Sequence, residues 1–75
     1  MTNQNDRTSI RGFLIMNSLT QNWLISQLAK RDVLIDKSNL SKILAGSLTG
    51  PKAELVVTNS LDIIKRYDHA LNAED

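Results

Sequence analysis

The stretch that decides the fold reads LTQNWLISQLAKRDVLIDKSNLSKILAG and runs from Leu19 to Gly46. Its first half begins with Thr20, a residue type whose side-chain oxygen caps helix N-termini. Leu24 and Leu28 follow at the spacing that places two side chains on one face of a helix. This half therefore predicts a short helix from residue 21 to about residue 30.

The second half of the stretch predicts another short helix, over residues 37–45. Asp36 can cap its N-terminus, and Gly46 can end it, because glycine is favoured just past a helix C-terminus. One side of this helix is apolar, with Leu40, Ile43 and Leu44. The other side is polar and carries no acid: Lys37, Ser38, Asn39, Ser41 and Lys42. In the turn before it, Val33–Ile35 alternates, so we expect Leu34 to point outward and its two neighbours inward.

Helices are also predicted on both sides of this stretch. Ahead of it, Thr8 or Ser9 can cap a helix from about Ile10 to Asn17. After it, Pro51 stands at the first position of a long helix that ends near Leu71. The apolar stripe predicted for this last helix comprises Ala53, Val56, Val57, Leu61, Ile64, Tyr67 and Leu71.

Length and composition favour one small, aliphatic, all-α domain. The chain has 75 residues, of which 41% are hydrophobic and only 4% aromatic. We expect a helical domain over residues 9–71. A flexible N-terminal arm is expected over residues 1–8, and a frayed tail over residues 72–75.

Several classes of protein find no support in the sequence. There is no cysteine, which excludes disulfides and thiolate zinc sites, and the single His69 has no set of neighbouring ligands. No catalytic triad signature or phosphate-binding glycine loop is present, so we expect neither an enzyme nor a cofactor. No apolar run is long enough for a membrane span, and the polar start MTNQNDRTS resembles no cleavable signal. These features predict a cytoplasmic protein without a membrane partner.

The charge is distributed unevenly along the chain. The net charge is only +1, but the segment Lys30–Lys52 holds five basic and two acidic residues, a net charge of +3. The remainder carries a net charge of −2. A basic middle between acidic flanks is the arrangement expected of a protein that binds a polyanion with one side.

This pattern resembles the lambda-repressor-like (Cro/C1-type, XRE) helix-turn-helix family of small phage and bacterial regulators. The matching pieces are Leu19–Gln21, Leu24, Leu28, Asn39–Gly46 and Gly50–Glu54. The resemblance covers residues 9–71. The chain departs from the usual pattern at Ile25, where a small residue is common, at Ala29, where glycine is common, and in its lengthened turn. The resemblance implies a compact four-helix domain that binds double-stranded DNA, associated with the nucleoid when bound.

Two groups of residues are candidates for DNA contact. The first group lies on the polar side of the helix predicted over residues 37–45, and its side chains can reach base edges in the major groove: Lys37, Ser38, Asn39 and Lys42. Helix N-termini and a lysine near Gly50 fit phosphates, with the serine assigned by its match to the family: Thr20, Gln21, Ser41 and Lys52.

The resemblance implies a transcriptional regulator that occupies its operator as a homodimer. Leu55 and Ile63, beside the apolar stripe of the last helix, are candidates for the dimer surface. An alternative function is an antirepressor or adaptor of the same fold that binds another regulator protein rather than DNA. A third interpretation, a packing unit of a larger assembly, would leave the acid-free helix face without an explanation.

Overall fold

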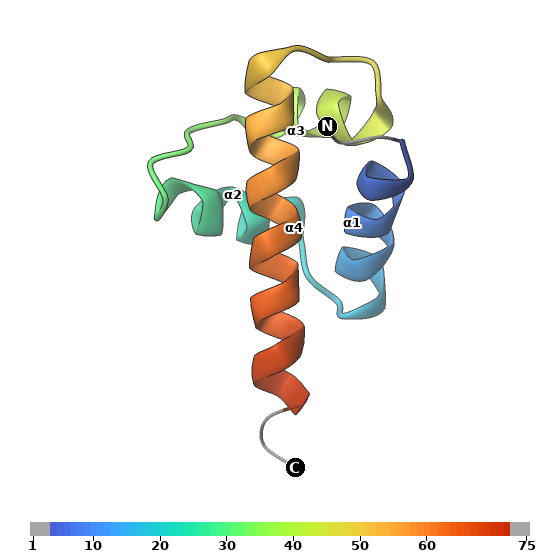
Figure 1. Cartoon of the computed structure of the whole chain (residues 1–75), viewed down its shortest axis with the longest axis vertical. Helices are drawn as coiled ribbons and strands as arrows, with labels where there is room; N and C mark the ends of the chain where they lie inside the picture. The colour runs from blue at the N-terminus through green and yellow to red at the C-terminus, as the bar shows by residue number, and fades with distance from the viewer. Residues whose placement is uncertain (1–3, 73–75) are drawn as a thin grey trace.

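The computed structural model describes residues 4–72 and is all-α, as the sequence predicts. Its helices are α1 (Gln4–Met16), α2 (Gln21–Ala29), α3 (Lys37–Ala45) and α4 (Pro51–Asn72). The long helix α4 sets the longest axis of the molecule, and α3 lies across its N-terminal end, with α1 and α2 to either side in this view (Figure 1). α3 contacts each of the other three helices, so its position is fixed by the whole fold.

The two short helices begin at the caps that the sequence predicts. The Thr20 hydroxyl oxygen accepts a hydrogen bond from the backbone N–H of Trp23 at 3.1 Å. A carboxylate oxygen of Asp36 accepts one from the backbone N–H of Asn39 at 2.7 Å. Each bond satisfies an N–H group that the first turn of a helix leaves without an internal partner.

The end of α3 and the start of α4 also follow local sequence rules. Gly46 ends α3 with φ at +85°, a left-handed conformation in which a Cβ is disfavoured. A Cβ there would lie 2.5 Å from Oε1 of Gln4, so the first turn of α1 approaches the end of α3 closely. Pro51 is the first residue of α4, where its missing N–H costs no hydrogen bond.

All four helices contribute to the core, α4 mainly through its N-terminal half. The buried apolar side chains of the core are Ile10, Leu14, Leu24, Leu28, Val33, Leu40, Ile43, Leu44, Ala53, Val56, Val57 and Ile63. In the turn that joins α2 to α3, Val33 is buried, Ile35 is half-buried and Leu34 is 70% exposed, which confirms the predicted alternation.

α1 begins six residues earlier than expected. It starts at Gln4, so residues 4–8 of the expected flexible arm form helix, while residues 1–3 lie outside the described residues. The physical reason is Arg7, which shares the buried face of α1 with Ile10 and Leu14 and is itself only 5% exposed. Its guanidinium lies 3.6 Å from a carboxylate oxygen of Glu54 in the first turn of α4. This ion pair fastens the extra turn of α1 to α4.

The buried face of α4 is rotated from the predicted stripe. Ile63, one of the two candidates for a dimer surface, is 6% exposed and belongs to the core, so it cannot contribute to such a surface. Leu61 and Ile64, predicted to be core, are only half-buried. The centre of the buried face is Ser60, which has no exposed surface. Because serine is polar, a prediction based on the spacing of apolar residues does not include this position in the buried face of α4.

The three aromatic residues of the chain meet where α1, α2 and α4 come together. The Tyr67 ring packs edge-on against Trp23 at 5.3 Å and against Phe13 at 5.9 Å between ring centroids. Trp23 is therefore a packing residue of the α2–α4 contact.

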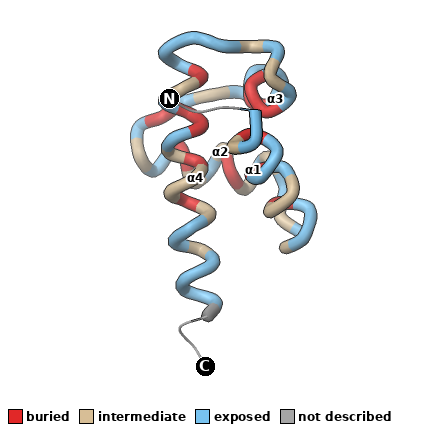
Figure 2. Tube along the Cα trace, turned by 45° about the vertical axis from the view of Figure 1, so that its right-hand side comes forward, coloured by how far each residue is buried: buried red, intermediate tan, exposed pale blue. Residues whose placement is uncertain are grey.

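The C-terminal turns of α4 extend beyond the other helices. Figure 2 shows that the tube there is mostly exposed, in contrast to the buried N-terminal half. Among the described residues, no helix is long and apolar enough to cross a membrane. The expected tail is helical at Asn72, and residues 73–75 lie outside the described part of the chain.

Candidate nucleic-acid interface

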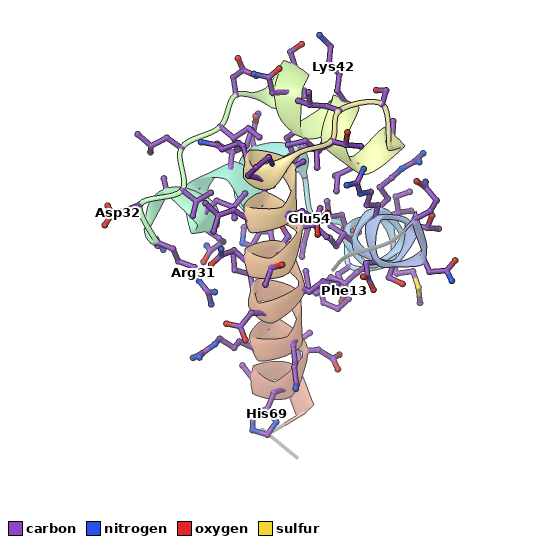
Figure 3. All side chains as sticks on the ribbon, turned by 45° about the horizontal axis from the view of Figure 1, so that its top comes forward. Phe13, Arg31, Asp32, Lys42, Glu54 and His69 are labelled. Carbon is purple, nitrogen blue, oxygen red and sulfur yellow. The ribbon has the colours of Figure 1, made fainter. Side chains whose placement is uncertain are left out.

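The outer face of α3 is a row of small and basic side chains. Leu40, Ile43 and Leu44 are buried, so the opposite face consists of Ser38, Lys42 and Ala45, which follow one another at helical spacing. All three residues are exposed. Lys42 stands on the outer side of α3, away from α4 (Figure 3). This face has no acidic side chain and no bulky apolar one.

The other base-contact candidates flank this row. Asn39 lies on the side of α3 that borders an open hollow of about 460 Å³, with Lys52 and the turn residue Leu34 around the same hollow. Lys37 and Ser41 lie on the other side, in register with the buried Leu44. The structure therefore brings Lys37, Ser38, Asn39 and Lys42 onto the exposed surface of one helix, but across more than half of its circumference.

Three of the predicted phosphate contacts meet beside the N-terminus of α2. The Ser41 hydroxyl donates a hydrogen bond to Oε1 of Gln21 at 2.6 Å, which joins α3 to the first turn of α2. Thr20 stands next to Gln21 as the cap. The backbone N–H groups of Gln21 and Asn22 are in the first turn, where a helix supplies them with no acceptor. A phosphate here would meet N–H donors and the positive end of the helix dipole.

Lys52, the fourth predicted phosphate contact, is already engaged. Its ammonium donates a hydrogen bond to the backbone carbonyl of Leu34 at 2.8 Å. This bond ties the turn over residues 30–36 to the first turn of α4. An ammonium has three N–H donors, so two remain for a further acceptor such as a phosphate.

Arg11 is a basic residue of this surface that the sequence analysis missed. It lines an open hollow of about 260 Å³ together with Gln21, Leu19 and two residues of α1. It is exposed and makes no ion pair with another residue of the range 4–72. Its place beside α2 depends on how α1 packs, and nothing in the local sequence signals it.

Arg31, counted in the basic middle of the chain, turns away from α3. One of its terminal nitrogens donates to Asp62 at 2.7 Å and the other donates to Asn59 at 3.3 Å. Arg66 donates to the same oxygen of Asp62 at 2.9 Å. Hydrogen bonds from Arg31, and then from Arg66, hold the pKa of the Asp62 carboxyl below its ordinary value. The charge of Arg31 is therefore directed to the middle of α4.

Asp36 adds a negative charge next to the candidate base contacts. Its carboxylate is exposed, caps α3 and borders the hollow that Asn39 also lines. The sequence pattern identified the cap, but the same charge opposes the approach of a phosphate to the N-terminal end of α3.

The part of the chain that the structure describes contains no group of three His, Asp or Glu side chains placed to hold a metal ion. Comparisons of the chain with protein-family models, with curated proteins and with solved structures found no match.

Proposed function

We propose that this protein binds double-stranded DNA in a sequence-specific manner, with α3 in the major groove, and regulates transcription by occupying an operator. The observation that carries the proposal is the exposed, acid-free outer face of α3, centred on Ser38 and Lys42. An α-helix is about 10–12 Å wide with its side chains, which matches the width of the major groove at about 12 Å.

The N-terminus of α2 supports this arrangement because a groove-binding helix needs anchors on the neighbouring phosphates. The bond from Ser41 to Gln21 fixes the first turn of α2 beside α3. In the proposal, the N–H groups of that turn bind one phosphate, and Arg11 binds the same strand nearby. Lys52 binds a phosphate on the other side of α3 while it holds the turn at Leu34.

Base contacts are assigned to the polar side chains that project from α3. Lysine donates hydrogen bonds to the acceptors of guanine, asparagine forms a pair of hydrogen bonds with adenine, and serine can form a hydrogen bond with either base. Lys42 and Ser38, at the centre of the face, carry the main contacts, and Lys37 and Asn39 read bases at its edges. These roles, like the lambda-repressor-like helix-turn-helix arrangement of α2 and α3, are part of the proposal.

A domain of this size covers only a few base pairs, and a pair of domains on a near-palindromic site would supply the missing specificity. We propose a homodimer on DNA, with Leu55 in its surface, since this side chain of α4 is 49% exposed. Sedimentation of the protein with and without its best duplex tests this point. A monomer under both conditions would remove the dimer from the proposal.

The second candidate function is an adaptor or antirepressor that binds another regulator protein. It draws support from Ile15 and Met16 at the end of α1, which are 78% and 85% exposed. Tight binding to a protein partner, without any salt-sensitive binding to DNA, would favour this function over the first.

The experiment that tests the proposal compares two lysines by fluorescence anisotropy on labelled duplexes at two salt concentrations. Lys42→Gln removes a charge from the α3 face, and the control Lys65→Gln removes one from the exposed side of α4. We expect Lys42→Gln to weaken binding to the best duplex by about 1–3 kcal/mol, while the control leaves it unchanged. Equal losses in the two variants would show that only net charge matters and would refute the role of α3.

A further inference from the structure

A second concave surface lies between α2 and α4, away from the candidate DNA interface. It is an open hollow of about 310 Å³, and its α4 residues begin at Ile63. Ile63 is eleven residues after Lys52 along the same helix, which corresponds to roughly 16 Å. No residue of α3 lines the hollow, so it shares no side chain with the outer face of that helix.

The inner wall of the hollow is aromatic and apolar. Trp23 from α2 and Tyr67 from α4 pack edge to face at 5.3 Å, and Ile63, one helical turn before Tyr67, also lines the hollow and is almost fully buried. Both rings are only half-buried, so each still offers part of its surface to the hollow. Such a wall accommodates a flat ring, which stacks on or packs edge-on against aromatic side chains.

The rim of the hollow is basic. Lys30, Arg31 and Arg66 all line it. The two arginines share a single oxygen of Asp62, and Lys30 forms no ion pair within residues 4–72. Three positive charges thus surround the hollow against one negative charge.

The arginines also keep hydrogen-bond donors in reserve. A guanidinium has five N–H donors. Arg31 donates two hydrogen bonds, one to Asp62 and one to Asn59, and Arg66 donates one, to Asp62. The two terminal nitrogens of Arg66 are left without a hydrogen bond to Asp62 and form a planar fork, which matches the geometry of a carboxylate.

From this combination we propose that the hollow between α2 and α4 is a binding site for a small aromatic carboxylate. The ring packs against Trp23 and Tyr67, and the carboxylate lies among Lys30, Arg31 and Arg66. The volume is at the lower end of the range typical of small-molecule sites, which suits a ligand of one or two fused rings. The proposal does not depend on DNA binding.

The test uses 2-naphthoate as the probe and the full chain labelled with ¹⁵N. Trp23 is the only tryptophan, so its indole N–H gives a single, assigned signal in the wall of the hollow. Naphthalene-2-carboxamide, which has the same rings without the charge, is the matched ligand. Lys30→Gln is the test variant, and Lys65→Gln is the matched variant, because Lys65 is exposed and does not line this hollow.

We expect naphthoate to shift the Trp23 indole signal saturably and the carboxamide to bind more weakly. Lys30→Gln should weaken naphthoate binding by about two- to fivefold, as for other partly exposed charge pairs, while Lys65→Gln leaves it unchanged. The absence of a saturable shift up to about 10 mM naphthoate would overturn the proposal. Equal affinities for acid and amide, or for the two variants, would overturn it as well, because the basic rim would then play no part.

Discussion

Asp36 has two effects that a single substitution can separate. Its carboxylate caps α3 through a 2.7 Å bond to the N–H of Asn39, and its negative charge stands beside the surface proposed to approach DNA. Asp36→Asn keeps an oxygen that can cap the helix but removes the charge. Asp36→Ala removes both. The first variant should therefore bind DNA more tightly with only a small loss of stability, and the second should bind more tightly but lose more stability than the first.

The magnitudes follow from the exposure of this side chain. A cap lost to alanine costs about 1 kcal/mol, whereas asparagine is about as good a cap as aspartate. The favourable interaction of the carboxylate with the helix dipole, about 0.3–1 kcal/mol, is lost in both variants. Because Asp36 is exposed, its repulsion of a phosphate is that of charges in water, about 0.5 kcal/mol at about 8 Å before screening by salt. We therefore expect DNA binding to tighten by roughly twofold.

The assay pairs urea unfolding with fluorescence anisotropy on duplex DNA at low and moderate salt. Asp68→Asn is the control, because it changes the net charge by the same amount at an exposed position near the far end of α4. We expect Asp68→Asn to leave DNA affinity unchanged. If Asp36→Asn and Asp68→Asn shift the affinity equally, or if Asp36→Asn weakens binding, the proposed approach of α3 to DNA is wrong.

Three further predictions follow. Asn39→Ala should change which duplexes bind best, at a cost of about 1–3 kcal/mol on the best site, and identical effects on specific and random DNA would refute a base contact. Gly46→Ala should lower the free energy of unfolding by about 1–2 kcal/mol, because φ at this residue is +85°. Gly12→Ala should raise it by up to about 1 kcal/mol, because Gly12 lies in the middle of α1 and a Cβ there would meet open space. Urea unfolding of both variants measures this contrast. The pKa of the Asp62 carboxyl is lowered in the folded protein, so this carboxyl becomes protonated at a higher pH in the unfolded chain than in the folded one. The contribution of Asp62 to stability is therefore present above the pKa of the unfolded state. It is lost as the pH falls toward the pKa of the folded state. Asp62→Asn should therefore destabilise the protein near pH 7 and much less near pH 3, in urea unfolding at about these two pH values, and an equal loss at both would contradict this assignment.

Those parts of the fold that depend on neighbouring residues in the sequence could be predicted. The caps at Thr20 and Asp36, the left-handed Gly46 and the first position of Pro51 each follow from the backbone needs of one helix end. The alternation around Leu34 in the long turn follows in the same way.

What the sequence could not supply depends on tertiary packing. Arg7 and Ser60 are buried although their types are usually exposed, and their burial extends α1 and rotates the core face of α4 toward Ile63. A signal for Arg7 exists, since it is spaced at helical intervals from Ile10 and Leu14. Ser60 has the same kind of signal, since it stands three residues after Val57 and three before Ile63, but a polar residue type is not assigned to a core on spacing alone.

In the candidate nucleic-acid interface, too, some features could be predicted from the sequence and others depend on tertiary packing. The exposed polar face of α3 follows from the spacing of Leu40, Ile43 and Leu44. The bond from Lys52 to Leu34 and the approach of Arg11 to Gln21 join segments that are distant in sequence, so residue types alone could not predict them.

The central claim is that α3 reads a DNA sequence. Its most direct test is to incubate the protein with a pool of duplex fragments at two salt concentrations and to sequence the bound fraction. If α3 lies in the major groove and contacts bases, a short site arranged as two related halves should be enriched, and the affinity for it should fall steeply as salt rises. Weak binding without enrichment of any sequence would contradict it.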